Sequence, residues 1–459
     1  MNLRPYQQEI VSHVGMAMDI DFRAPMVVLP TGGGKTVCFA HITETLSSEG
    51  KVVWIVAHRQ ELISQASGTL KKFHIPHGII KSGFPLDAKK PVQVASVQTL
   101  VRRTATLPPP DVIIIDECHH AVSPTYLKII AAFPRATVLG FTATPCRLNG
   151  AGLGTVFDYM ILGPTNKFLT ENGFLSPAKY YAPPKKADFS NVPMRGGDYA
   201  TGELEEVMDE ATVTGDAVAH YQRICPGVPM LVFCVSVAHA HHVAEQYRAA
   251  GYRAAAVDGK LSDEDRKDRI EGLGTGKYQV ITSCDLIGEG LDVPVCGAAQ
   301  LLRPTASPAL HLQQIGRVLR PLPGKTAIIL DHVGNTAKHG FASTDFAWSL
   351  AGIKNKKSDK APATRTCDAC YSVHTPAKVC PYCGFEYPVK SRALTAQKIV
   401  DGQLVEVEQT REERADEVKN ARSHGELVAI AKSRGYQKPH FWAMKTLRGR
   451  SYVHLLPRI

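Results

Sequence analysis

The chain has 459 residues, of which 44% are hydrophobic and 21% are charged, a composition typical of globular proteins with about two to four domains. It contains no apolar run of the ~20 residues that a membrane helix needs, and its first residues lack the apolar segment of a signal peptide. Seven of the eleven cysteines are scattered singly through apolar stretches and four are clustered, which fits a reducing compartment. We therefore expect an intracellular, cytoplasmic protein.

The net charge of +10 lies almost entirely in the last quarter of the chain. Residues 1–345 contain 33 Lys and Arg against 32 Asp and Glu, whereas residues 346–459 contain 20 against 11. A basic segment on a nearly neutral body is typical of nucleic-acid binding, although a solvated linker face would have the same composition.

Apolar, β-rich runs alternate with helical stretches in two parts of the chain. In residues 1–160 the runs lie at 26–29, 52–56, 92–96, 112–115 and 137–141. In residues 213–345 they lie at 230–235, 254–257, 279–282, 298–302 and 327–330. This alternation predicts the α/β class, with mostly parallel sheets that helices cover on both faces.

The remaining segments differ in composition. Residues 161–212 contain scattered prolines and paired glycines, which predict a connector with a small insertion. Beyond the second α/β part we expect a basic linker at 346–365, a metal-binding module at 366–390 and a charged helical tail at 391–459.

A glycine-rich turn follows the first apolar run and precedes a helix-compatible stretch. Three successive glycines allow backbone N–H groups to face a triphosphate, and a helix N-terminus adds positive potential. Lys35 is placed to reach the β- and γ-phosphates, and Thr36 to put its hydroxyl on Mg²⁺. The nucleotide-binding residues predicted in this turn are Thr31, Gly32, Gly33, Gly34, Lys35 and Thr36.

Two carboxylates follow the apolar run at 112–115. Asp116 is placed to hold Mg²⁺, and Glu117 to orient or deprotonate the attacking water. The glycine-rich turn by itself is also compatible with a loop that binds no nucleotide. Because both segments follow strands of one parallel sheet, we interpret them together as a site that hydrolyses ATP.

Further segments are predicted to surround this site. Gln7 can donate to and accept from an adenine edge, and Thr142 and Thr144 follow the fifth run. Gln313 precedes Arg317 and Arg320, which share one helical face. Guanidinium groups neutralise charge on a transferring phosphoryl group, although two surface salt bridges would also explain these arginines.

In order and spacing these segments resemble the superfamily 2 helicases and translocases, over about residues 1–345. The resemblance implies two tandem RecA-like domains that close over ATP, followed here by a small zinc module and a short helical tail. It also implies that a glycine turn near residue 290 contacts the nucleotide. The motif residues it implies are Gln7; Gly34, Lys35 and Thr36; Asp116, Glu117 and His119; Thr142 and Thr144; Gly290 and Asp292; and Gln313, Arg317 and Arg320.

The motif variants distinguish branches of this superfamily. DEAD-box RNA helicases have aspartate where His119 stands and His-Arg where Gln313-Gln314 stands. The likeness is closest to the RadD-like bacterial and phage DNA helicases, which implies action on DNA in repair, recombination or replication-fork remodelling. An RNA-directed helicase is one alternative. The other is an ATP-gated clamp or partner-recruiting factor that does not unwind.

A cysteine cluster follows the second α/β part. Two Cys-x-x-Cys pairs separated by nine residues have the spacing of a closed, structural Zn²⁺ site; the predicted ligands are Cys367, Cys370, Cys380 and Cys383. Two disulfides and an iron–sulfur cluster are the alternatives. Such a module also suggests docking of a protein partner, such as a single-strand-binding or replication and repair protein.

The tail combines aromatic residues with lysines and arginines. Basic residues beside aromatics can grip phosphates and stack on bases. Phe441 and Trp442 can equally form the core of a two-helix unit, and this is the interpretation we favour for them.

Overall fold

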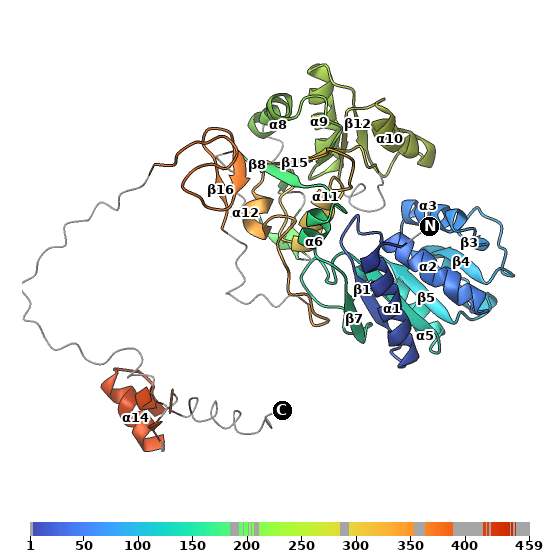
Figure 1. Cartoon of the computed structure of the whole chain (residues 1–459), viewed down its shortest axis with the longest axis horizontal. Coiled ribbons are helices and arrows are strands. Elements are labelled where there is room, and N and C mark those ends of the chain that lie inside the picture. The colour runs from blue at the N-terminus through green and yellow to red at the C-terminus, as the bar shows by residue number, and fades with distance from the viewer. Residues whose placement is uncertain are drawn as a thin grey trace, which may run out of the picture. The chain divides into compact units, whose positions relative to one another are not determined.

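The computed structural model describes residues 3–183, 192–195, 197–200, 202, 204–205, 211–284, 293–352, 363–388, 416–418, 420–421, 424–440, 442–443 and 446. The chain divides into two compact units, residues 1–387 and 388–459 (Figure 1). Within the described ranges, no helix is both long and apolar enough to cross a membrane.

The first lobe is built on a seven-stranded sheet in the order β3-β4-β2-β5-β6-β1-β7, and all its pairings are parallel. Its strands are β1 (Pro25–Val28), β2 (Val53–Ala57), β3 (His77–Ile80), β4 (Val92–Ser96), β5 (Val112–Asp116), β6 (Thr137–Thr142) and β7 (Tyr159–Leu162). Its helices are α1 (Pro5–Asp19), α2 (Lys35–Ser48), α3 (Gln60–Lys72), α4 (Val97–Leu100) and α5 (Pro124–Ala132), with short 3₁₀ turns η1 (Thr104–Thr106) and η2 (Cys118–His120).

Alternation along the strands explains the two layers of helices. In β2, Val53 and Ile55 pack in the cluster that includes α2 and α3, whereas Trp54 and Val56 pack in the opposite cluster that includes α5. Because successive side chains point to opposite faces, a strand buried on both faces needs a continuous apolar sequence. For this reason, the apolar runs identified in the sequence coincide with the central strands of the sheets.

The second lobe is built on an eight-stranded sheet in the order β12-β13-β11-β14-β15-β8-β17-β16. The first six strands are parallel, and the last two pairings are antiparallel. The strands are β8 (Ala178–Tyr181), β11 (Met230–Phe233), β12 (Ala254–Val257), β13 (Val280–Ser283), β14 (Ala298–Leu301), β15 (Ala327–Asp331), β16 (Arg365–Thr366) and β17 (Ser372–His374). The helices are α6 (Asn166–Glu171), α8 (Ala211–Ile224), α9 (Val237–Ala249), α10 (Asp263–Thr275), α11 (Pro308–Gly316) and α12 (Asn335–His339).

The predicted fold class is confirmed: a parallel sheet, a mixed sheet that is mostly parallel, and a four-cysteine cluster are present in an α/β structure. Two features refine the predicted organisation. β8, which lies in the stretch predicted as a connector, is an internal strand of the second sheet. β16 and β17, which frame the first cysteine pair, extend the same sheet (Figure 1). The domain bounds themselves stay predictions.

The second unit contains α14 (His424–Ser433). Leu427, Val428 and Ile430 of this helix pack with Ala421 and Ala443, and Trp442 lies partly buried against them. Trp442 thus has the packing role favoured from the sequence, while Phe441 lies outside the described residues.

Candidate functional site

The glycine-rich turn connects β1 to the first residue of α2, Lys35. Gly32 and Gly34 have φ values of 84° and 90°, a region that residues with a Cβ rarely adopt. A side chain at Gly34 would also collide with the Gln7 amide. Both positions therefore require glycine, and the backbone forms the turn expected to cradle phosphates.

Residues of α1 hold this turn in place. The Gln7 Nε2 group donates to the Gly33 carbonyl at 3.2 Å, and the Tyr6 hydroxyl donates to the same oxygen at 2.8 Å. The Gln7 Oε1 atom accepts from the Arg4 backbone N–H at 3.0 Å. Gln7 thus lies against the phosphate turn, and its contact with adenine stays a prediction.

The predicted ammonium and carboxylate groups lie close together. Lys35 Nζ is 3.9 Å from Glu117 Oε1 and 3.4 Å from the Leu29 carbonyl, to which it donates. Asp116 Oδ1 accepts from the Glu117 backbone N–H at 2.9 Å. Glu117 has a φ of 49°, and such outliers persist where surrounding structure enforces them, often at active sites.

One oxygen of Glu117 has unused hydrogen-bonding capacity. Glu117 is buried, and among the described residues its Oε2 atom has no hydrogen-bond partner. His119 Nδ1 lies 3.5 Å from this oxygen. A buried acceptor without a donor is costly, so this oxygen is suited to a water or another polar group brought in with the substrate. The residues present therefore fit a nucleotide site.

A chain of polar contacts leads from Glu117 to the second lobe. His119 Nδ1 lies 3.2 Å from Thr142 Oγ1, which accepts from the Thr144 backbone N–H at 3.1 Å. Gln313 Nε2 of α11 donates to Thr144 Oγ1 at 3.4 Å. The predicted threonines and Gln313 are therefore brought together with the carboxylates, and the contact crosses between the lobes.

The C-terminal end of α11 lies directly on the phosphate turn. A Cβ added to Gly316 would lie 2.8 Å from the Thr31 Cβ atom, and one added to Gly32 would lie 3.8 Å from Arg320 Cγ. Arg317, which follows Gly316, is buried. Both predicted arginines are thus at the junction with the turn, whereas Gly290 and Asp292 lie outside the described residues.

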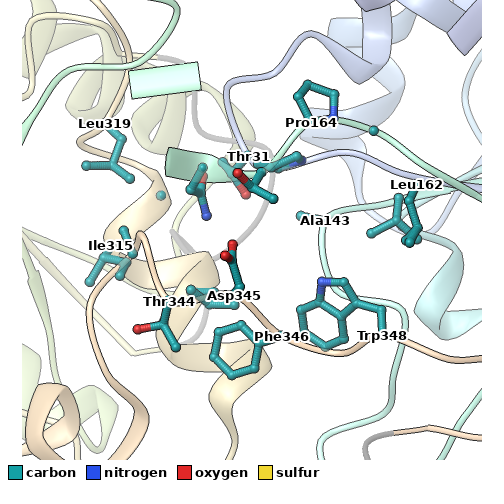
Figure 2. A pocket seen from close by; sticks show the side chains of 18 residues that line it. Thr31, Ala143, Leu162, Pro164, Ile315, Leu319, Thr344, Asp345, Phe346 and Trp348 are labelled. Carbon is teal, nitrogen blue, oxygen red and sulfur yellow. The ribbon is translucent and has the colours of Figure 1, made fainter. Parts of the chain in front are cut away.

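A cavity of about 130 Å³ adjoins this junction. Thr31 and Asp345 point into it, and Ile315, Phe346 and Trp348 form apolar walls (Figure 2). Its lining does not include Lys35, Asp116 or Glu117. The predicted catalytic residues therefore do not line this cavity, which is enclosed by residues of both lobes.

The four predicted metal ligands come together. Their sulfur atoms all lie within 4.8 Å of one another, with Cys367 and Cys383 at 3.7 Å and Cys370 and Cys380 at 3.8 Å. A tetrahedron with Zn–S bonds of about 2.3 Å has sulfur–sulfur edges of roughly 3.8 Å. The cluster therefore has the dimensions of a closed zinc site, which also argues against two disulfides.

Hydrogen bonding favours the thiolate form of Cys380. Burial opposes ionisation of Cys380, but bonds from the Ser372 hydroxyl and from the backbone N–H groups of Tyr382 and Cys383 lower its pKa to about 5. Thiolates are the form that binds metal.

A second connection joins the lobes and could not be predicted from the sequence. Arg266 of α10 donates to Glu61 of α3 at 3.0 Å, and Gln60 donates to Asp263 at 2.6 Å. We call these two contacts the α3–α10 latch. The partners are more than 200 residues apart, so no local pattern indicates their pairing.

Comparison with known proteins identifies the family. Residues 1–147 match the model "Type III restriction enzyme, res subunit", and residues 217–321 match "Helicase conserved C-terminal domain". A "51.5 kDa protein" of Lactococcus phage (isolate 7-9) is 32% identical over 390 residues, which cover 84% of this chain and 83% of that protein. The chain belongs to the superfamily 2 helicases.

Other relatives agree with this assignment. The "Putative ATP-dependent helicase IRC3" of Saccharomyces cerevisiae is 30% identical over 79% of this helicase, which spans 55% of the yeast protein. A solved fragment of a "putative HsdR subunit of a type I restriction enzyme" from Vibrio vulnificus has a TM-score of 0.58 and 21% identity, over 74% of this chain and 67% of that chain. The structural likeness supports the two-lobed fold, and the helicase domains imply use of ATP. The four cysteines lie outside both family matches.

Proposed function

We propose that this superfamily 2 helicase acts on DNA and hydrolyses ATP between its two lobes. The observation that carries the proposal is the line of contacts that joins Lys35 to Glu117 and continues through His119, Thr142 and Thr144 to Gln313 of the second lobe. DNA rather than RNA is supported by His119 and by the Gln-Gln pair at 313–314, which differ from the DEAD-box pattern.

Each residue has a proposed role in hydrolysis. The backbone of Thr31–Gly34 and the Lys35 ammonium would bind the phosphates, and Thr36 and Asp116 would hold Mg²⁺. That ion, when bound, neutralises charge on the phosphates. Glu117 would orient the attacking water through its unpaired oxygen. Gln313, Arg317 and Arg320 would contribute only when the second lobe is closed on the first.

ATPase measurements with different nucleic acids test this proposal. Hydrolysis by the full-length chain should be stimulated more by single-stranded, duplex or forked DNA than by RNA of the same length and sequence. Glu117→Gln, assayed in parallel, reveals any contaminating ATPase. Greater stimulation by RNA would favour the RNA-directed alternative. Stimulation by DNA without strand displacement would favour a translocase or clamp.

We further propose that Cys367, Cys370, Cys380 and Cys383 bind one Zn²⁺ per chain. The dimensions of the sulfur cluster support this assignment. Elemental analysis of the purified protein should find about one zinc and no iron. An iron–sulfur absorbance band, or protein free of zinc, would contradict it.

The basic tail is proposed as a nucleic-acid handle. Residues 389–459 contain 14 Lys and Arg against 8 Asp and Glu. Truncation after residue 388 keeps the cysteine module and should weaken DNA binding more than it lowers basal ATP hydrolysis. Each lost phosphate contact should reduce the log–log salt slope by about 0.7 to 0.9. An unchanged affinity and slope would favour the alternative, in which this region docks a protein partner.

A further inference from the structure

The cysteine module is hydrogen-bonded into the second sheet. β17 pairs antiparallel with β8, with Ser372 opposite Tyr181 and Val373 opposite Tyr180. The Ala182 backbone N–H donates to the Tyr371 carbonyl at 3.0 Å, and Val373 belongs to the main core cluster. β8 is therefore held between β15 on one side and the metal-binding hairpin on the other.

Ser372 connects that hairpin to the cysteine sulfurs. Its hydroxyl lies 3.0 Å from Cys370 Sγ and 3.4 Å from Cys380 Sγ. Its carbonyl accepts from the Cys367 backbone N–H at 2.9 Å. The residue that pairs with Tyr181 thus also contacts three of the four candidate ligands, so a change in the shape of the cluster would act directly on β17.

The other end of the same segment contacts a candidate catalytic arginine. Ser176, which is buried, donates from its backbone to the Leu319 carbonyl at 2.7 Å. Its hydroxyl donates to the Arg320 carbonyl at 3.1 Å. Ala182 lies six residues after Ser176, and an extended segment of that length spans roughly 20 Å.

We propose that residues 176–182 act as a strut that positions Arg320 according to the state of the four-cysteine centre. The cluster fixes β17, β17 fixes β8, and Ser176 then holds the Leu319–Arg320 backbone beside the phosphate turn. Ser176 is a positioning residue, because it acts on the Arg320 backbone and not on nucleotide. The inference rests on the proposed role of Arg320 in hydrolysis and on metal binding by the cysteines.

The strut separates turnover from nucleotide binding. The phosphate turn is held by α1 through Tyr6 and Gln7, whereas the backbone N–H and the hydroxyl of Ser176 donate to Leu319 and Arg320 of the second lobe. Weakening the strut should therefore lower kcat while the affinity for ATP stays the same. A defect confined to a peripheral zinc module would change neither quantity.

Ser176→Ala in the full-length chain is the first test. It should lower kcat about five- to tenfold, with the KM for ATP and the binding of a fluorescent ATP analogue unchanged within about twofold, as expected for loss of one buried hydrogen bond. Ser176→Thr keeps the hydroxyl and should recover most of the rate. Ser433→Ala is a matched control, since Ser433 also donates to a backbone carbonyl, that of Ile430 at 2.9 Å, but belongs to the second unit.

Hydrogen exchange of the full-length chain is the second test and requires no hydrolysis. Removing the metal with a chelator should speed exchange at the Ala182 amide and also at the Ser176 amide, and adding Zn²⁺ back should restore protection. Faster exchange confined to residues 365–387, with Ser176 protected and kcat unchanged, would overturn the strut. A chain that takes up no Zn²⁺ would overturn it as well. If the wild type does not hydrolyse ATP, the proposed function fails, but the exchange result still decides whether the strut exists.

Discussion

The α3–α10 latch offers a direct test of how lobe contacts support turnover. Arg266 and Glu61 are 3.0 Å apart, and their side chains are 15% and 26% exposed. Hydrogen bonds to charged groups contribute about 1.5–3 kcal/mol when buried, whereas exposed ion pairs contribute about 0.2–1 kcal/mol. For this intermediate exposure we expect a coupling free energy between Arg266 and Glu61 of about 1 kcal/mol. This corresponds to roughly a fivefold change in an equilibrium constant or a rate.

A double-mutant cycle on kcat/KM for ATP measures this coupling. Glu61→Ala and Arg266→Ala should each lower kcat/KM about fivefold, and the double variant should lose little more than either single variant. Exchanging the charges, with Glu61→Arg and Arg266→Glu together, should recover part of the loss.

Lys267→Ala is the control, because Lys267 is the next residue of α10 and its ion pair with Glu271, at 3.7 Å, stays within the second lobe. This variant should retain kcat/KM within about twofold. Losses that add in the double Glu61 and Arg266 variant, with no recovery on charge exchange, would refute the reasoning.

Three further outcomes are expected. Glu117→Gln should bind a fluorescent ATP analogue normally but hydrolyse ATP at least ~100-fold more slowly, because the water-orienting carboxylate is lost. Arg317→Ala should lower turnover about 1,000-fold in the same ATPase assay, with the analogue still bound. Burial lowers the pKa of His311 to about 4 and that of His332 to about 3, from 6.5. The unfolded chain therefore binds protons that the folded second lobe does not, so the melting temperature should be steady near neutral pH and fall as the pH drops from 6.5 toward 4.

The residues that could be predicted from the sequence are those that belong to a short motif of neighbouring residues. The turn before Lys35 and the carboxylates at 116–117 each follow a doubly buried strand, and parallel strands bring their carboxyl ends to one edge of a sheet. Knowledge of the strands was therefore enough to expect Lys35 near Glu117, and the structure places them 3.9 Å apart. The same reasoning applies to Thr142, at the end of β6.

Other features depend on pairings between distant segments. β8 has only four residues, two of them tyrosines, and the stretch around it is interrupted by prolines. Its sequence therefore shows neither a long apolar run nor a clear alternation, and its place is decided by β15 and β17. Asp198 is a second example. It follows paired glycines that read as a loop, yet its buried carboxylate accepts from the Thr305 hydroxyl at 3.0 Å and from the Ala306 backbone at 2.6 Å.

The path of the chain limits how the lobes can move during a cycle of hydrolysis. After β15 of the second sheet, the chain returns to the first lobe, where the Gly154 backbone N–H donates to the Leu350 carbonyl at 2.9 Å. Trp348 and Leu350 pack against the core cluster on the α5 face of the first sheet. The chain then rejoins the second sheet through β16 and β17.

Complete separation of the lobes would break this return segment away from the first lobe and expose its apolar side chains, which is unfavourable. Rotation of one lobe about the segment would keep those contacts, and it would open the α3–α10 latch and separate Gln313 from Thr144. Such a motion would withdraw the second-lobe groups from the phosphate turn without disturbing the turn itself. For this reason, variants of the latch and of the strut should change turnover through closure, and ATP binding to the open form should be preserved.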